Sequence, residues 1–304
     1  MDLFYWKSPQ GNFGDDLNEW IWDSLLPGWR GWERAVTLVG VGTIFNDVHF
    51  PDDRPGQFLI LGSGVGYGAP PKDERARRFD IRSLRGPRSA QSLNLPESTG
   101  IVDPAMMIAT LDAFKFVRPT GRPIFVPHVS SVDRHPWEQI CAQIGVDYVS
   151  PSGDAQTVIR KIAGASLVIA ESLHAAILAD AFRVPWRAVS LTESFNREKW
   201  LDWGGSLQLV PEVRSLVPAV DRLLAVRNRA GLACAPKPPG SAGFGVDRKP
   251  SFKRRLRFML ERALIPQALK AQLTLPPQLS SFALLQQRRD QYSEVLRGVI
   301  RDYS

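Results

Sequence analysis

The sequence predicts an α/β protein in which two Rossmann-like domains face one cleft and a basic, helical C-terminal region follows them. Short apolar runs alternate with segments of helical periodicity on both sides of a link near residues 119–122, as is typical of parallel sheets covered by helices. We therefore expect an N-terminal domain at residues 1–118 and a second one at 119–234. Residues 235–250 are rich in proline and glycine, which indicates a linker.

Charge is the second observation behind this division. Residues 251–304 hold ten Lys and Arg against four Asp and Glu, so they carry six of the seven net positive charges. The rest of the chain is nearly neutral, and we expect no nucleic-acid binding. Hydrophobic residues make up 44% of the chain, which is enough apolar surface for folded cores.

No secretory signal and no uncharged apolar stretch of about 18 residues is visible, so we expect a soluble or peripheral protein. Two cysteines form no disulfide framework, which fits a reducing cytoplasm. The four histidines are scattered without zinc-site spacing, and we expect no metal.

The first half alternates buried strands with helices. Strands are expected at residues 3–6, 36–44, 58–61 and 81–84. A helical segment is expected over residues 16–26, and Pro87 suits the first turn of another helix.

The second half repeats the alternation. Strands are expected at residues 124–126, 148–150, 167–170 and 186–191, and helices at residues 137–144, 155–163 and from 172 onward.

His174 lies where the strand at residues 167–170 becomes a helix, and this position is typical of ligand sites. In an open parallel sheet, the first amides of such a helix point into the crevice at the strand ends. An anion bound there would meet the imidazole of His174, which can hold or move a proton. A structural histidine remains the alternative, and the same two interpretations apply to His128 after residues 124–126.

Residues 12–18 read NFGDDLN and precede the first helix. Asp15 and Asp16 have two equal interpretations: they cap the helix, or they bind and deprotonate a sugar hydroxyl. The glycine-rich residues 61–68 suggest a phosphate loop, but no helix begins directly after them, so close backbone packing is the favoured explanation.

Arg85 ends a strand and is followed by Gly-Pro, so its guanidinium is a candidate to enter the cleft and bind carboxylate or phosphate. A surface arginine is the alternative. Asp103, before Pro104, either orders Arg85, contacts the ligand or simply forms a turn.

Five motifs together resemble the polysaccharide pyruvyl transferase family, and the likeness covers about residues 1–225. They are NFGDDLN at 12–18, GVGTI at 40–44, RGPRS at 85–89, DPA at 103–105 and ESLH at 171–174. The resemblance implies a fold like that of GT-B glycosyltransferases and phosphoenolpyruvate as donor substrate, without a further cofactor. This chain departs from the pattern of the family at Val102 and Ala175, two positions where the family often has glycine.

The resemblance also implies roles for individual residues. Arg85 and the pair Leu173-His174 would contact the donor. Because phosphoenolpyruvate carries a carboxylate and a phosphate, the amides after Ser172 and the side chain of Arg88 are further candidates to neutralise it. Asn12 and Asp103 complete the candidate substrate-binding set. His174 would serve as general acid or proton relay, and Asp15 or Asp16 would activate the acceptor.

The expected acceptor is a lipid-linked oligosaccharide. In the segment 251–270, apolar residues recur at helical spacing and basic residues lie between them. This pattern fits a helix that lies on the inner leaflet of a membrane. The alternative is a helix that packs on the body of the protein and exposes its basic residues to solvent. Two other functions fit the same fold: a glycosyltransferase that uses a nucleotide sugar, and a non-catalytic membrane-associated assembly subunit.

Overall fold

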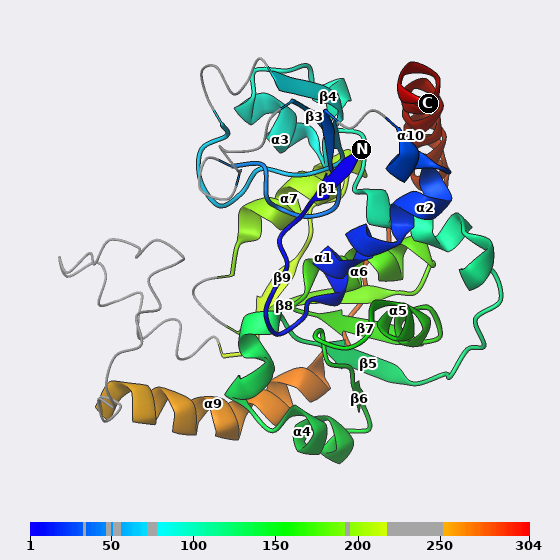
Figure 1. The fold of residues 1–304 in the computed structure, drawn as a ribbon. Helices are drawn as coiled ribbons and strands as arrows, with labels where there is room; N and C mark the ends of the chain where they lie inside the picture. The colour runs from blue at the N-terminus through cyan, green and yellow to red at the C-terminus, as the bar shows by residue number, and fades with distance from the viewer. Residues whose placement is uncertain (33–34, 47–49, 51–55, 72–77, 192–194, 218–251) are drawn as a thin grey trace.

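Both halves of the chain form parallel sheets with helices packed beside them, which confirms the predicted α/β class (Figure 1). The computed structural model describes residues 1–32, 35–46, 50, 56–71, 78–191, 195–217 and 252–304, with side chains in the last range from residue 259 onward. The predicted linker at residues 235–250 lies outside the described residues.

The first sheet has four parallel strands in the order β1-β2-β3-β4. The strands are β1 (Asp2–Phe4), β2 (Val36–Val39), β3 (Gln57–Leu61) and β4 (Phe79–Ser83), and the short helices of this half are α1 (Phe13–Asp16), α2 (Ile21–Leu25) and α3 (Pro87–Ser92). Leu38 pairs in register with both Leu3 and Leu59. Leu38 and Leu59 are fully buried, as expected for the centre of a parallel sheet.

The helical segment expected over residues 16–26 is observed, but it is divided into separate short helices. Between α1 and α2 lie a 3-10 turn and Trp20, whose φ of −137° is not helical. Asn18 gives the physical reason: its side-chain amide donates to the carbonyls of Asp15 and Val41, both at 2.9 Å, and its side-chain oxygen accepts from the amide of Val41. Since Val41 bonds to Asn18, β2 also ends earlier than the predicted residue 44.

The second sheet has five parallel strands in the order β6-β5-β7-β8-β9. They are β5 (Pro123–Val126), β6 (Asp147–Tyr148), β7 (Leu167–Ala170), β8 (Trp186–Ser190) and β9 (Val213–Ser215), and the helices of this half are α4 (Trp137–Gln143), α5 (Ala155–Ala163), α6 (Leu173–Ala181) and α7 (Arg197–Ser206). The predicted positions of β7 and α5 are confirmed at both ends. No element was predicted where α7 and β9 lie.

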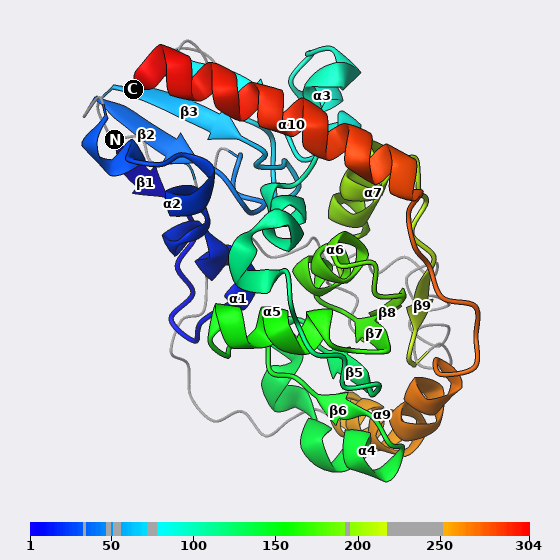
Figure 2. The same cartoon turned by 90° about the vertical axis from the view of Figure 1, so that its right-hand side faces the viewer.

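The C-terminal helix α10 (Phe282–Tyr303) runs along the first sheet and begins near α6 and α7, as Figure 2 shows. The Tyr292 hydroxyl donates to the Leu61 carbonyl at the end of β3 (3.3 Å). The Arg289 guanidinium donates to the carbonyls of Met106 (3.0 Å) and Ala181 (2.8 Å). This helix is therefore part of the body and joins both halves.

Helix α9 (Phe252–Ala271) precedes it and packs through its second half. Ile265 and Leu269 are fully buried in a cluster with Phe125 and Trp137, and buried Glu261 accepts two hydrogen bonds from Arg134. None of the helices in the described ranges is long and apolar enough to cross a membrane.

Candidate active site

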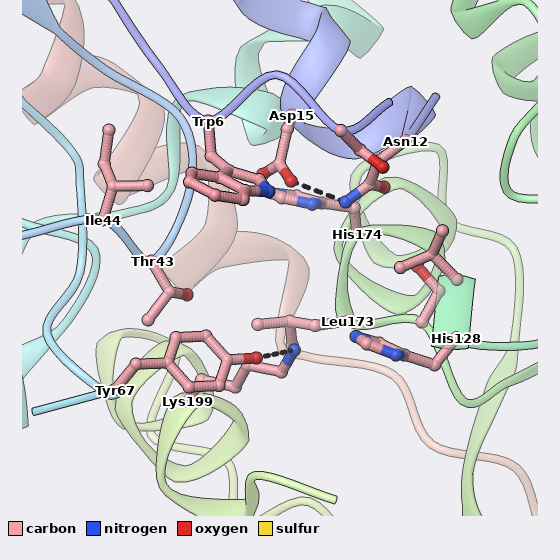
Figure 3. A pocket seen from close by; sticks show the side chains of 13 residues that line it. Trp6, Asn12, Asp15, Thr43, Ile44, Tyr67, His128, Leu173, His174 and Lys199 are labelled. Carbon is pink, nitrogen blue, oxygen red and sulfur yellow. Dashed lines mark hydrogen bonds between the residues drawn. The ribbon is translucent and has the colours of Figure 1, made fainter. Parts of the chain in front are cut away.

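One cavity of about 270 Å³ opens beyond the carboxyl ends of the strands of both sheets (Figure 3). Segments after β1, β2 and β3 supply one part of its wall, and segments after β5 and β7, together with α7, supply the other. The lining residues are Trp6, Ser8, Asn12, Asp15, Thr43, Ile44, Tyr67, His128, Val129, Ser172, Leu173, His174 and Lys199. Ligands of open parallel sheets bind at this end of the strands, so this pocket is the candidate active site.

Glu171 organises the strand ends of the second sheet. Its buried carboxylate accepts hydrogen bonds from the amides of His128 (3.0 Å) and Leu191 (3.1 Å). It thereby fastens the segments that follow β5 and β8 to the end of β7. His128 lines the pocket, so the structure brings it to the place that one interpretation of the sequence gave it.

Helix α6 begins directly at the pocket, which confirms the predicted change from strand to helix. Ser172 precedes the helix in extended conformation and does not cap it with its own side chain. Ser172, Leu173 and His174 line the cavity. The first amides of α6 are therefore placed beside the pocket, and the positive end of the helix dipole favours an anion there.

The His174 ring lies against the backbone of Gly14, and 13% of its side chain is exposed. A Cβ atom at residue 14 would lie 2.0 Å from the ring Nδ1, so only glycine permits this approach. His174 Nε2 is 3.8 Å from Asp103 Oδ2, beyond hydrogen-bond distance, and it has no hydrogen-bond partner among the described residues. Burial, together with the charges of Lys199 and Arg85, lowers the pKa of His174 to about 3, so the ring is neutral at pH 7.

Asp15 lines the pocket and Asp16 does not. The Asn12 side chain caps α1 through the amide of Gly14 (3.3 Å) and donates to the Asp15 carboxylate (2.6 Å). Burial raises the pKa of Asp15 to about 7, although the charge of Lys199 acts in the opposite direction. Asp15 can therefore exchange a proton near neutral pH. Asp16 accepts from the backbone amide of Asn12 (3.0 Å) and lines a neighbouring cavity.

Asp103 lies behind His174 and outside the pocket lining. One of its oxygens accepts from the Ala105 amide (2.9 Å), which is the turn before Pro104 that the sequence offered as one interpretation. Its other oxygen is buried, has no hydrogen-bond partner within the described part of the chain, and faces His174. Burial raises the pKa of Asp103 to about 6, against the charge of Arg85.

The model of the polysaccharide pyruvyl transferase family matches residues 38–193, just over half of the chain. This chain belongs to that family. It is also 41% identical over 318 aligned positions to the succinoglycan biosynthesis protein ExoV of Rhizobium meliloti (strain 1021), with the full length of both chains covered. No solved structure matches it. The predicted family is thus confirmed, and the protein is a transferase.

In this pyruvyl transferase, Arg85 is buried with 1% of its surface exposed and does not line the pocket. Its Nε donates to the Asp202 carboxylate (2.9 Å), and its two terminal nitrogens donate to the Thr43 hydroxyl (2.5 Å) and the Val65 carbonyl (3.1 Å). Thr43 lines the pocket, so Arg85 reaches the site through this hydroxyl. Direct contact of Arg85 with the donor stays a prediction.

Arg88 lies on the surface, half exposed, and pairs with Glu198 at 2.6 Å. Its predicted donor contact likewise stays a prediction. Within the glycine run at residues 61–68, Gly64 permits close packing, because a Cβ there would lie 2.2 Å from the Arg85 guanidinium carbon. The close neighbour is a side chain, whereas the sequence had suggested another backbone.

Sequence reasoning missed Lys199, Tyr67 and Trp6 in the pocket of the pyruvyl transferase. Lys199 lies in α7, a helix that the sequence analysis did not assign, and its ammonium donates to the Tyr67 hydroxyl (3.3 Å). Trp6 is 49% exposed, unusual for so large an apolar ring. An available signal was the lysine at the start of a helical segment, where positive charge is disfavoured. Within the described ranges, no three His, Cys, Asp or Glu side chains group as a metal site.

Proposed function

We propose that this pyruvyl transferase moves the pyruvyl group of phosphoenolpyruvate onto a sugar of a lipid-linked exopolysaccharide repeat unit as a cyclic ketal, with release of phosphate. One observation carries the proposal: the anion-attracting start of α6 and His174 share a single pocket with Asp15, whose carboxyl group titrates near neutrality. Phosphoenolpyruvate has two anionic groups for such a pocket. The relative named for succinoglycan biosynthesis supports an exopolysaccharide acceptor.

The chemistry proceeds in two additions at C2 of the donor. A proton adds to C3 of the enol, C2 becomes electrophilic, and one sugar hydroxyl attacks it. The bond between C2 and the phosphate oxygen then breaks, and a second hydroxyl of the same sugar forms the second C2–O bond. In the balance, one hydroxyl proton ends on C3 and the other on phosphate.

Asp15 is the group suited to handling the hydroxyl proton. With a pKa of about 7 it is partly deprotonated at neutral pH, and Asn12 holds one of its oxygens. It can therefore take a proton from the first hydroxyl and return one to the donor. Asp16, turned toward the neighbouring cavity, has no place in this step.

His174 binds the donor and relays a proton in this scheme. Its ring is neutral at pH 7 and lines the pocket, so it can contact a donor group there and take up a proton. A bound phosphoenolpyruvate brings negative charge, which raises the proton affinity of the ring. Asp103, 3.8 Å from Nε2, would stabilise the protonated ring.

The proposed arrangement of domains is GT-B-like, with residues 1–118 and 119–234 as the two domains and the active site between them. It is supported by the two separate parallel sheets and by a pocket lined from both of them. Acceptor contacts are assigned to the N-terminal side, where Trp6 offers an aromatic face for a sugar ring.

We place the reaction on the cytoplasmic face of the inner membrane, with peripheral contact through the segment 251–270. The support is the excess of basic residues there and the exposure of Met259 (59%) and Leu264 (38%) on α9. Double substitution of both by Glu should reduce flotation with anionic liposomes. Equal flotation of the variant and the unchanged chain would contradict membrane docking. Truncation before α9 is unsuitable because α10 belongs to the core.

The function is tested by incubating the protein with phosphoenolpyruvate and lipid-linked oligosaccharide extracts. We expect phosphate release together with a pyruvyl mass gain on the oligosaccharide. His174→Ala should abolish both signals, and Lys115→Met, an exposed lysine that pairs with Asp112 outside the pocket, should keep both. Phosphate release without modification of the sugar would contradict the transfer reaction.

A further inference from the structure

We propose that Lys199 binds an anionic group of the donor and that Arg85 is a positioning residue that acts through Thr43. The inference deepens the proposed function and rests on its donor, phosphoenolpyruvate. It assigns a substrate contact to a residue outside every motif that carried the family resemblance.

Lys199 is a buried cation that has no counter-ion among the described residues. Only 9% of its surface is exposed, and the polar partner of its ammonium is the neutral hydroxyl of Tyr67, at 3.3 Å. No carboxylate of the described residues lies within ion-pair distance of this ammonium. An unpaired buried charge costs free energy, so a site that keeps one is suited to an anionic ligand.

The position of Lys199 in α7 is also unfavourable for a cation. It is the third residue of the helix, whose Asn196 cap accepts from the amides of Glu198 and Lys199. The first turn of a helix carries partial positive charge and favours acidic side chains. Helix α7 therefore holds an ammonium in the pocket against its own dipole, and a bound anion would relieve both costs.

The geometry gives the anion two sources of attraction. Figure 3 shows the Lys199 ammonium and the Tyr67 hydroxyl across the pocket from Trp6, Asp15 and His174. Phosphoenolpyruvate has a carboxylate and a phosphate, so one group can meet the start of α6 while the other meets Lys199. The charge of Lys199 already lowers the proton affinity of His128 and His174. An anion that screens this charge would raise the proton affinity of His174.

Arg85 differs from Lys199 because its donors are occupied. Its guanidinium bonds to Asp202, Thr43 and Val65 and is covered by Gly64. A donor molecule in the pocket would meet Thr43 before it met Arg85. We therefore assign Arg85 to the orientation of Thr43 and of the loop after β2.

The test compares equilibrium binding to the full chain. Lys199→Met should raise the dissociation constant for phosphoenolpyruvate at least tenfold, and Lys199→Arg should restore most of the affinity because it keeps the charge. The matched control is Lys115→Met, an exposed lysine paired with Asp112, which should bind like the unchanged protein. Thermal unfolding of all variants should show that each is folded.

Steady-state kinetics supply the second readout. Lys199→Met should raise KM for the donor more than KM for the acceptor, and a merely structural residue would not divide the two. Unchanged donor binding by a folded Lys199→Met would overturn the assignment.

Titration with inorganic phosphate separates this inference from the proposed function. If the unchanged protein binds no phosphoenolpyruvate, the proposed function fails. The role of Lys199 as an anion ligand then stands if inorganic phosphate binds the unchanged protein more tightly than Lys199→Met, and it falls if the two bind equally or neither binds.

Discussion

Two groups of buried charges lie side by side in this protein and are built in opposite ways. Arg85 and Asp202 form an ion pair of 2.9 Å with 1% and 2% of their side chains exposed, and Asp202 also accepts from the Ser89 amide and hydroxyl. In the pocket, by contrast, the Lys199 ammonium is buried without an ionic partner in hydrogen-bond contact among the described residues, and the Nε2 of the neutral His174 ring likewise has no hydrogen-bond partner there. The difference teaches that the paired charges hold α7 to the first sheet, and the unpaired charge of Lys199 awaits a ligand.

The largest expected effect separates activity from stability at His174. We expect His174→Ala to lower kcat by about 10² to 10⁴-fold, the usual loss for a general acid or base. The melting temperature should change little, because the ring has no hydrogen-bond partner among the described residues. The rate of phosphate release measures activity, and thermal unfolding measures stability. A variant that keeps full turnover would show that His174 has a structural role only.

Asp202→Ala should show the opposite pattern. Removing one partner leaves the Arg85 guanidinium buried and unpaired, which costs about 3–5 kcal/mol of unfolding free energy. Chemical denaturation measures this loss. Arg88→Ala is the matched control, because its exposed ion pair with Glu198 contributes at most about 1 kcal/mol. Equal stability of the two variants would refute the structural role of the Arg85 pair.

Gly14→Ala probes the position of the His174 ring without altering any charge. The new methyl group would overlap the His174 imidazole and push it aside, and a misplacement of about 1 Å can cost 10²-fold in rate. Gly31→Ala is the control, since a Cβ there meets nothing within 4 Å. A Gly14→Ala variant with normal kcat would show that the ring position is not critical.

The pH profile of the activity tests the proposed role of Asp15 as general base. As general base it must be deprotonated, so kcat/KM should rise with pH through about 7, the raised pKa of Asp15. Lys199→Met removes a positive charge that lowers this pKa, so the rise should move to higher pH. Asp103→Asn should keep the rise, whereas Asp15→Asn should abolish it together with most activity. If the rise occurs at the same pH in Lys199→Met, the charge of Lys199 does not control the pKa of Asp15.

Much of the fold could be predicted from the sequence because the central strands, such as β2, β3 and β7, are short, mostly apolar runs with mostly buried side chains. Residues 155–163 and 167–170 were assigned correctly at both ends, where Asp154 caps the helix and the strand is uniformly apolar. The division of the helical segment at residues 16–26 was not predicted, because the side chain of Asn18 there bonds to Val41, 23 residues away. Such a long-range contact leaves no local pattern.

The site was predictable only in part, for the same reason. The turn before His174 and the acidic turn at Asp15 follow strand ends, and the pocket brings the two together. Arg85 has the residue type expected of an anion ligand, but its burial against Asp202 depends on a residue 117 positions away. Lys199 belongs to no recognisable motif, and only the tertiary structure shows that it has no carboxylate partner in the described part of the chain.

The most direct test of the account is a crystal structure of the protein with phosphoenolpyruvate bound. We expect the donor between the start of α6 and Lys199, with C2 open toward Asp15 and the Arg85–Asp202 pair unchanged. Donor bound directly to Arg85 after separation of that pair, with Lys199 left uncontacted, would contradict the division between paired and unpaired charges.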